Sequence, residues 1–257
     1  MRGDKSIFTY AFDAALEFGS RTSKGYASKF IVDGCWYKIN CGAFNSHAEA
    51  ACSLLLELSN IEEYVKYELC MVNGEFATKS SDWTNSSLFQ PLDCLYRLSS
   101  DCNSLHVLSY SVHGSALMDL VIRFATRDLE ITDFADKLSL LLQFDAFVLN
   151  EDRHFGNIGF INENGIWRMS PFYDFDCALL SCCEDLSDDY LAQYLKKKPS
   201  LPFCPTHEEQ LALALSISDK RLNIKPFDAE QLIGGIWSEE YSIGKNQVVE
   251  YFKAMNT

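Results

Sequence analysis

Several features that would place a chain in a special class are missing from these 257 residues. No apolar run reaches the roughly 18 residues that a membrane-spanning helix needs, so we expect no membrane span. The first 20 residues lack the apolar centre of a secretory signal peptide, because Asp4, Asp13 and Glu17 interrupt them. Internal repeats and low-complexity linkers are also missing. These absences favour a cytoplasmic protein and leave open export or injection by a non-classical route.

Metal-binding cysteine motifs and excess positive charge are missing too. The ten cysteines include no C-x-x-C pair, and most lie in apolar or amphipathic runs, which argues against a zinc site and a disulfide scaffold. Lys and Arg number 22 against 36 Asp and Glu, a net charge of −14. Direct nucleic-acid binding is therefore not expected, because a phosphate backbone attracts clustered positive charge. With 47% hydrophobic residues, the chain can bury a large core.

The densest polar cluster lies in residues 147–176, FVLNEDRHFGNIGFINENGIWRMSPFYDFD. Asp152 and Asn157 have the D-x-x-x-x-N spacing of a kinase catalytic loop, and Asp174 follows after an Asn164-Gly165 turn. A kinase positions the acceptor hydroxyl, so we expect Asp152 to orient that hydroxyl or accept its proton. Asn157 and Asp174 offer the hard oxygen ligands that Mg²⁺ prefers. An incidental polar surface loop is the alternative, and the apolar runs on both sides of the cluster argue against it.

Residues around this loop have several candidate roles. Two apolar runs, Phe147–Leu149 and Ile158–Ile161, are predicted to be paired strands that hold the loop. His154 is a candidate to orient the catalytic acid, to contact phosphate or to support the loop, and loop support is favoured. Arg153 is interpreted as a flanking surface charge, and Asp176 as a second metal ligand or a solvated acid.

NEDRHFGN followed by SPFYDFD resembles the catalytic core of HipA-like serine/threonine kinases, including their cell-translocating branch. The D-R-H-x-x-N loop also resembles that of phosphoinositide 3-kinase-like enzymes, and the S-P-F-Y-D context favours the HipA side. The resemblance implies an α+β, two-lobed, protein-kinase-like fold. A small β-rich lobe with one helix would span residues 1–80, and a larger α-rich lobe would span residues 81–257. It also implies ATP and Mg²⁺ as cofactors and a protein hydroxyl as acceptor.

The N-terminal part supplies candidates that would contact the nucleotide phosphates. Segments 27–32 and 35–40 are predicted to form a hairpin, because Asp33-Gly34 between β-rich runs is a strong turn signal. Lys38 in its second strand would, taken alone, extend to solvent, and the resemblance makes it the lysine that binds the ATP phosphates. The polar segment 20–30 stands where the phosphate-covering loop of a kinase lies. Its candidate phosphate contacts are Ser23, Lys24 and Gly25, and its candidate autophosphorylation sites are Ser20, Thr22 and Ser23.

A helix is predicted over residues 45–61, where leucines and alanines form an apolar face. Ser46 and Glu49 have the S-x-x-E spacing of a capping box. Glu49 therefore has two competing roles, capping its own helix or pairing with Lys38 as a kinase glutamate does. Glu57 is the alternative partner of that lysine, and Glu49 is preferred.

The remaining chain is predicted to continue the kinase-like order. Asn73-Gly74 indicates a second hairpin within residues 63–78. The following Lys79–Asp82 is the expected link between lobes, where backbone groups would bind adenine. Residues 88–147 have a helical pattern with Thr132 as an N-cap, and Glu184–Asp189 is interpreted as a solvated acidic loop. The final helices are expected at 207–217, 228–236 and 246–255.

Two rival functions stay open from the sequence. A lipid or small-molecule kinase uses a similar loop, but this acidic chain shows no basic membrane-facing surface. A nucleotide-binding pseudokinase or interaction module is weakened because the residues expected for catalysis occur together. They are Lys38, Asp152, Asn157 and Asp174. The expected partners are ATP and a protein substrate of unknown identity.

Overall fold

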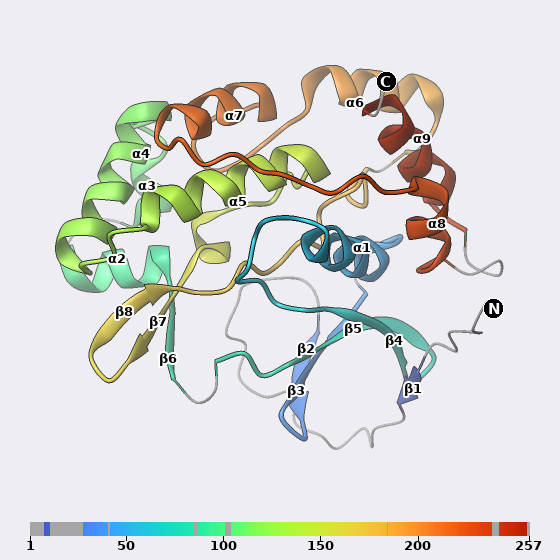
Figure 1. Ribbon diagram of the computed structural model, residues 1–257, viewed down its shortest axis with the longest axis horizontal. Helices are drawn as coiled ribbons and strands as arrows, with labels where there is room; N and C mark the ends of the chain where they lie inside the picture. The colour runs from blue at the N-terminus through green and yellow to red at the C-terminus, as the bar shows by residue number, and fades with distance from the viewer. Residues whose placement is uncertain are drawn as a thin grey trace.

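The computed structural model describes residues 8–10, 28–40, 42–84, 87–100, 104–183, 185–237 and 242–255. Two β-sheets and a set of helices make up these residues, which confirms the predicted α+β class (Figure 1). The strands are β1 (Phe8–Tyr10), β2 (Lys29–Val32), β3 (Cys35–Ile39), β4 (Glu68–Val72), β5 (Glu75–Ser81), β6 (Leu88–Pro91), β7 (Gly159–Glu163) and β8 (Ile166–Met169). The helices are α1 (Asn45–Glu57), α2 (Leu92–Ser100), α3 (Leu105–Leu108), α4 (Gly114–Arg123), α5 (Phe134–Val148), α6 (Asp188–Lys197), α7 (His207–Ser216), α8 (Ala229–Gly234) and α9 (Lys245–Met255). A π-helical turn (Phe124–Asp128) extends α4, and a 3₁₀ turn covers Phe155–Asn157.

The larger sheet has the strand order β1-β4-β5-β3-β2, and its neighbours are antiparallel except for the parallel pair β1 and β4. Helix α1 contacts β4 and β5 and also α8, so it lies between the sheet and the helical part of the molecule (Figure 1). The smaller sheet, β6-β7-β8, lies beside helix α2, which contacts β6 (Figure 1). The proposed lobe boundary between residues 80 and 81 stays a prediction.

Three tight turns lie where the sequence predicts them. Asp33-Gly34, Asn73-Gly74 and Asn164-Gly165 join β2 to β3, β4 to β5, and β7 to β8. Both residues of each dipeptide have positive φ, from 49° at Asp33 to 88° at Gly165. Asn, Asp and Gly tolerate this conformation, which matches the twist of a two-residue hairpin. The three hairpin predictions are confirmed.

The predicted pairing of Phe147–Leu149 with Ile158–Ile161 is wrong. Phe147 belongs to α5, which ends at Val148, and Leu149 is the left-handed cap residue with φ 52°. β7 pairs instead with β6 and β8. A short apolar run is compatible with a buried helix or a strand, and here the helical periodicity of the preceding residues continues through it.

Both predicted helix caps are wrong. Phe44 is the N-cap residue of α1 and makes no side-chain cap bond, while Ser46 lies inside the helix and its backbone N–H donates to Asn40 Oδ1. Asp133 rather than Thr132 is the N-cap residue of α5. Cap positions depend on where the chain enters the helix. At α1 the side chain of Asn40, which precedes the helix, accepts the hydrogen bond from a backbone N–H of the first turn.

Other boundaries also differ from the prediction. Residues 63–65 lie outside the sheet and exchange backbone hydrogen bonds with Phe172. Residues 88–91 form β6 instead of a helix, and the acidic run contributes Asp188 and Asp189 to the first turn of α6, where negative charge favours a helix N-terminus. The final helices α7, α8 and α9 follow the predicted ranges closely.

The main hydrophobic core extends from α1 through α2, α4 and α5 to α9. A small second cluster, formed by Phe30, Tyr37, Cys70, Val72 and Ala77, lies within the larger sheet. Side chains alternate between the faces of a strand, so Lys38, next to Tyr37, projects from the opposite face. In the described part of the chain, no helix has both the length and the apolar character required to cross a bilayer.

Candidate active site

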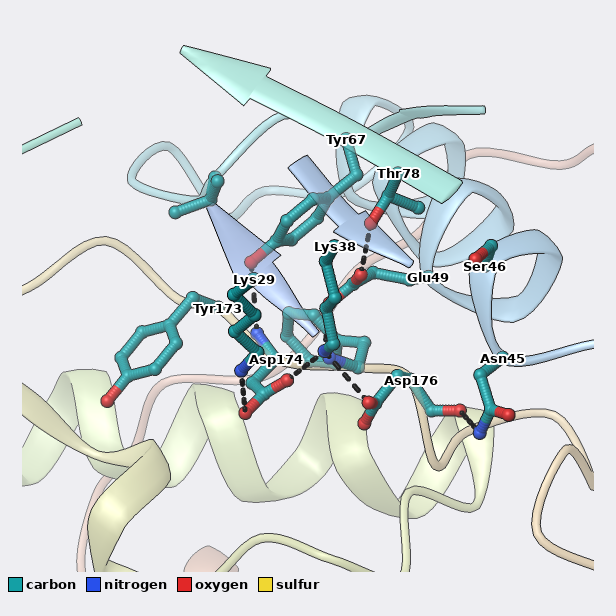
Figure 2. Close-up of polar contacts among 12 residues, drawn as sticks. Lys29, Lys38, Asn45, Ser46, Glu49, Tyr67, Thr78, Tyr173, Asp174 and Asp176 are labelled. Carbon is teal, nitrogen blue, oxygen red and sulfur yellow. Dashed lines mark hydrogen bonds and ion pairs between the residues drawn. The ribbon is translucent and has the colours of Figure 1, made fainter. Parts of the chain in front are cut away.

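Lys38 on β3 is the centre of the site, and its ammonium group contacts three carboxylates, as Figure 2 shows. Lys38 Nζ lies 3.2 Å from Glu49 Oε1 and 2.8 Å from Asp176 Oδ2, and it also contacts Asp174 Oδ1. We call Lys38, Glu49, Asp174 and Asp176 the lysine cluster. It brings together residues that the sequence predicts to share one nucleotide site, although 136 positions separate Lys38 from Asp174.

Glu49 is the acid on α1 that pairs with Lys38. Its side chain is fully buried, and its Oε2 accepts a 2.7 Å hydrogen bond from Thr78 Oγ1 on β5. Thr78 is the cross-strand neighbour of Lys38, so both of their side chains project toward α1. The alternative acid, Glu57, contacts Lys66 at the surface instead.

Burial and interactions within the cluster oppose each other in setting the pKa of Lys38, Asp174 and Glu49. Burial would lower the pKa of Lys38, but Asp174, Glu49 and Asp176 raise it well above its ordinary value. Burial would raise the pKa of Asp174, but Lys38 and Lys29 lower it well below the usual range. Burial raises the pKa of Glu49 more than Lys38 lowers it. Lys38 and Asp174 are therefore both charged at neutral pH.

Asp176 is a member of the cluster and not a solvated acid. Its side chain is 17% exposed and forms the ion pair with Lys38. Its backbone oxygen accepts hydrogen bonds from Asn45 Nδ2, at 2.8 Å, and from Ser181 Oγ. The bond from Asn45 holds the segment after Asp174 against the start of α1.

The catalytic-loop residues follow the left-handed cap of α5. The side chain of Asp152 is about half exposed, and its Oδ2 lies 3.9 Å from His154 Nε2. His154 Nδ1 accepts a 2.9 Å hydrogen bond from the N–H of Gly156, and this bond caps the start of the 3₁₀ turn. His154 thus bonds within the loop, as the favoured role of loop support requires, and its other two candidate roles stay predictions.

The two polar atoms of the Asn157 side-chain amide differ in their hydrogen bonding. Its Nδ2 donates a 3.0 Å hydrogen bond to the backbone oxygen of Asp152. Its Oδ1 is buried and has no hydrogen-bond partner among the described residues. A buried carbonyl oxygen without a partner is costly, unless a cation or a ligand donor meets it. The chemistry of this oxygen and of the Asp174 carboxylate fits Mg²⁺, which prefers hard oxygen ligands.

Arg153 is not a surface charge, and the interpretation of it as one is wrong. Its side chain is 0% exposed, as is that of Asp145 on α5. Arg153 Nε and Nη2 donate to the two carboxylate oxygens of Asp145 at 2.8 and 3.0 Å. Nη1 donates to the backbone oxygens of Asn157 and Tyr173 at 2.9 and 2.7 Å. We call Arg153 and Asp145 the arginine pair; it ties the catalytic loop to the segment that carries Asp174.

A cavity of about 290 Å³ opens beside Lys38 and Asp174. Aromatic rings form part of its wall: the ring centroids of Trp83 and Tyr173 lie 5.4 Å apart in a stacked arrangement, and Phe89 meets Trp83 edge-on. Tyr173 also donates a 2.7 Å hydrogen bond to the backbone oxygen of Gly156 in the catalytic loop. The described residues that line the cavity are Lys29, Trp36, Tyr37, Lys38, Tyr67, Thr78, Ser80, Trp83, Thr84, Ser87, Phe89, Pro91, Gly156, Tyr173 and Asp174.

Some site residues were not found from the sequence, and some predictions lie outside the described residues. Lys29 lines the cavity and was missed, although its place opposite Lys38 across a two-residue turn follows from the predicted hairpin. Ser80 belongs to the predicted adenine link and also lines the cavity. The predictions for Ser20, Thr22, Ser23, Lys24 and Gly25 lie outside the described residues.

Comparison with protein-family models and with curated proteins finds no match. Among solved structures, the chain is similar to the Helicobacter pylori proinflammatory kinase CtkA, with a TM-score of 0.63, 12% sequence identity, and 96% of this chain and 93% of that chain covered. It also matches a Shewanella oneidensis HipA, solved with HipB and operator DNA, with a TM-score of 0.39, 11% identity, and 85% and 57% of the two chains covered. The likeness to CtkA shows the fold, and it confirms the kinase-like fold that the resemblance implied.

Proposed function

We propose that this chain is an ATP- and Mg²⁺-dependent phosphotransferase that transfers the γ-phosphoryl group to a protein hydroxyl. The observation that carries the proposal is the convergence of Lys38, Asp174 and the aromatic wall on one cavity. A nucleoside triphosphate needs a flat, apolar place for its base and cations for its phosphates, and this cavity offers both.

Asn157 and Asp174 are the residues that would hold Mg²⁺. Asn157 supplies a buried oxygen with no partner among the described residues, and Asp174 supplies an ionised carboxylate. Bound there, Mg²⁺ would neutralise charge on the phosphates. The arginine pair holds the backbone of Asn157 and of Tyr173, next to Asp174, so it fixes the spacing of the two ligands.

Lys38 would bind phosphate oxygens, as the strand lysine of a kinase does. Glu49 and Thr78 hold it from the α1 side, so its ammonium group reaches the cavity from a fixed direction. Backbone groups near Ser80 would meet the base, and Trp83 and Tyr173 would contact its face. Ser23, Lys24 and Gly25 are proposed to cover the phosphates from the preceding loop.

Asp152 would orient the acceptor hydroxyl or accept its proton. Burial raises the pKa of Asp152, with Asp174 and Asp176 adding to the rise and His154 opposing it. A raised pKa makes a carboxylate a better proton acceptor than a free aspartate. Its half-exposed position leaves room for a hydroxyl from a protein segment, which supports a protein acceptor over an enclosed small molecule. Serine or threonine specificity, autophosphorylation and a cytoplasmic location stay predictions.

The test is transfer of radiolabel from γ-labelled ATP with Mg²⁺, to the protein itself and to proteins of a cell lysate. We expect labelled bands with the wild type and a loss of at least about a hundredfold in Asp152→Asn, since a positioned base contributes roughly 10²–10⁴-fold. The matched control is Asp219→Asn, which makes the same change at an exposed acid far along the chain and should keep full transfer.

Three results would decide against parts of the proposal. Equal labelling by the wild type and Asp152→Asn would remove Asp152 from catalysis. Label found only in a lipid extract would replace the protein acceptor by a lipid. Nucleotide binding without transfer to any acceptor would leave a pseudokinase.

A further inference from the structure

Tyr67 immediately precedes β4, and its side chain contacts the segment that carries Asp174. Its hydroxyl oxygen accepts a 3.4 Å hydrogen bond from the backbone N–H of Asp174, and Figure 2 shows its ring pointing toward that residue. Tyr67 also lines the cavity beside Lys38. The catalytic groups proposed above do not include this hydroxyl, although it touches the backbone of a residue that would hold Mg²⁺.

The backbone of Asp174 has a conformation that needs support from its surroundings. Its φ is 63°, in the left-handed region that residues with a side chain adopt uncommonly. Such a conformation persists where contacts from the rest of the structure fix it. Because φ is the rotation about the bond from this nitrogen to the α-carbon, a partner for the N–H helps to fix the direction in which the carboxylate projects.

Side chains on α1 hold the two residues that follow. The N–H of Phe175 donates to Glu49 Oε1 at 3.4 Å. The backbone oxygen of Asp176 accepts a 2.8 Å hydrogen bond from Asn45 Nδ2. Tyr67 adds the same kind of support one residue earlier, so three consecutive residues are each bonded by a different side chain.

Tyr67 is itself attached to α1. Its backbone N–H donates a 2.8 Å hydrogen bond to Oγ of Ser53, a buried residue of that helix. Two residues earlier, the N–H of Val65 donates to the backbone oxygen of Phe172 at 2.8 Å. Residues 65–67 therefore connect α1 to the segment that leads into Asp174, and the phenol ring reaches its N–H from this anchored backbone.

We propose that Tyr67 is a positioning residue, which holds Asp174 in the orientation that binds Mg²⁺. The inference rests on the proposed function, because Asp174 is one of the two ligands assigned to that ion. Tyr67 acts through the backbone of Asp174 and not on the metal. Groups that orient a metal ligand in this way raise the affinity for the metal without joining its coordination.

The experiment compares binding of one nucleotide with and without its metal. The dissociation constants of a non-hydrolysable ATP analogue are measured in Mg²⁺ and in EDTA for the wild type, Tyr67→Phe and Tyr64→Phe. Trp36 and Trp83 line the cavity, so quenching of tryptophan fluorescence reports binding, and calorimetry checks it. Tyr64→Phe is the matched control, because it makes the same change three residues earlier, outside the described cavity lining.

We expect Tyr67→Phe, which keeps the ring and removes only the hydroxyl, to weaken binding in Mg²⁺ by about threefold or more, within the range of one net hydrogen bond. Binding of the metal-free analogue should stay within about twofold, because Lys38 and the aromatic wall are unchanged. Tyr64→Phe should change neither constant. Circular dichroism should show that both variants are folded.

Two outcomes would overturn the proposal and leave the proposed function intact. In the first, Tyr67→Phe weakens binding equally with and without Mg²⁺, which would make the hydroxyl a contact of the nucleotide or a support of the cavity wall. In the second, it changes neither constant while the wild type binds the analogue more tightly in Mg²⁺. A wild type that binds equally well in Mg²⁺ and in EDTA would instead remove the Mg²⁺ site from the proposed function, and the role of Tyr67 with it.

Discussion

Two buried ionic groups lie close together in this molecule, and they differ in how completely their charges are satisfied. In the arginine pair, one guanidinium meets one carboxylate through two hydrogen bonds, and its Nη1 donates to two backbone oxygens. Both side chains are 0% exposed. In the lysine cluster, one ammonium group meets three carboxylates beside a cavity, and Asp174 and Asp176 are 12% and 17% exposed.

From this difference we expect a structural role for the arginine pair, and we assign the proposed ligand-binding role to the lysine cluster. A fully buried ion pair that also bonds backbone oxygens presents no exposed charge to a ligand, and it fixes the elements that it joins. A cluster with excess negative charge at the edge of a cavity can exchange partners when a cation or a phosphate arrives. The arginine pair thus positions Asn157 and the Asp174 segment, and the lysine cluster provides the groups that would meet nucleotide and metal.

The largest expected effect comes from removing the cation of the lysine cluster. Lys38→Met should reduce phosphate transfer by about a hundredfold or more, because one charged contact in an enclosed site contributes roughly 10²–10³ in rate. Single-turnover kinetics with saturating ATP would measure it. Circular dichroism at 25 °C should show a folded protein. Full transfer by this variant would contradict the assignment of Lys38.

Breaking the arginine pair should act mainly on stability. Arg153→Leu leaves Asp145 buried without its counter-ion, so the free energy of unfolding should fall by about 3–5 kcal/mol. Urea denaturation at neutral pH would measure the loss. The double variant Arg153→Leu/Asp145→Leu should recover part of it, because no unpaired charge is left.

A matched change at the surface sharpens this second prediction. Arg168 pairs with Glu163 where both side chains are partly exposed, so Arg168→Leu should change stability by less than about 1 kcal/mol. Equal losses for Arg153→Leu and Arg168→Leu would remove the distinction between a buried pair and a surface pair.

Two buried histidines outside the two ionic groups are expected to give a pH dependence of stability. Burial lowers the pKa of both His47 and His207 to about 4. Between pH 6.5 and 4 the unfolded chain therefore binds protons that the folded chain does not, and stability falls as the pH is lowered through this window. The full effect is on the order of 3 kcal/mol for each histidine, from 1.36 kcal/mol per pKa unit.

The check on this dependence is a denaturation series from pH 7 to pH 4. The wild type should show a steeper fall than His47→Asn or His207→Asn, which cannot gain that proton. Parallel pH profiles for all three proteins would show that these histidines do not titrate as their burial implies.

The smallest expected effect distinguishes the two acids of α1. Glu57→Gln removes a surface contact with Lys66, so it should leave transfer unchanged and alter stability by less than about 1 kcal/mol. Glu49→Gln, in contrast, weakens the ion pair that holds Lys38 and should lower transfer. A greater loss of transfer from Glu57→Gln than from Glu49→Gln would reverse the pairing seen in the structure.

The sequence predicted those parts of the fold that depend on interactions between neighbouring residues. The three Asn-Gly and Asp-Gly turns were correct because positive φ is a property of the turn residues themselves. The fold class followed from a resemblance over about thirty residues around Asp152 and Asp174. The helix at Asn45 began where it was predicted, but its predicted cap was wrong because the N–H of Ser46 is bonded by a side chain outside the helix, that of Asn40.

The site could be predicted only in part, because its geometry also depends on contacts between residues that are far apart in the sequence. Arg153 looked like a flanking charge because its partner, Asp145, belongs to the preceding helix and the helix end must turn back to bring them together. Lys29 was missed, although the pairing of strands across the Asp33-Gly34 turn places position 29 opposite position 38. Asn157 Oδ1 has no partner among the residues that the structure describes because the loop uses the other amide atom, and sequence carries no signal for that choice.

The most direct test of the contrast between the two ionic groups is the shift in melting temperature that ATP with Mg²⁺ produces. A ligand that binds only the folded state stabilises it by roughly 2.7 kcal/mol at a hundred times its dissociation constant. The wild type and Lys66→Met should show the same upward shift, and Lys38→Met should show little or none. A full shift in Lys38→Met would contradict the claim that the lysine cluster is the nucleotide site.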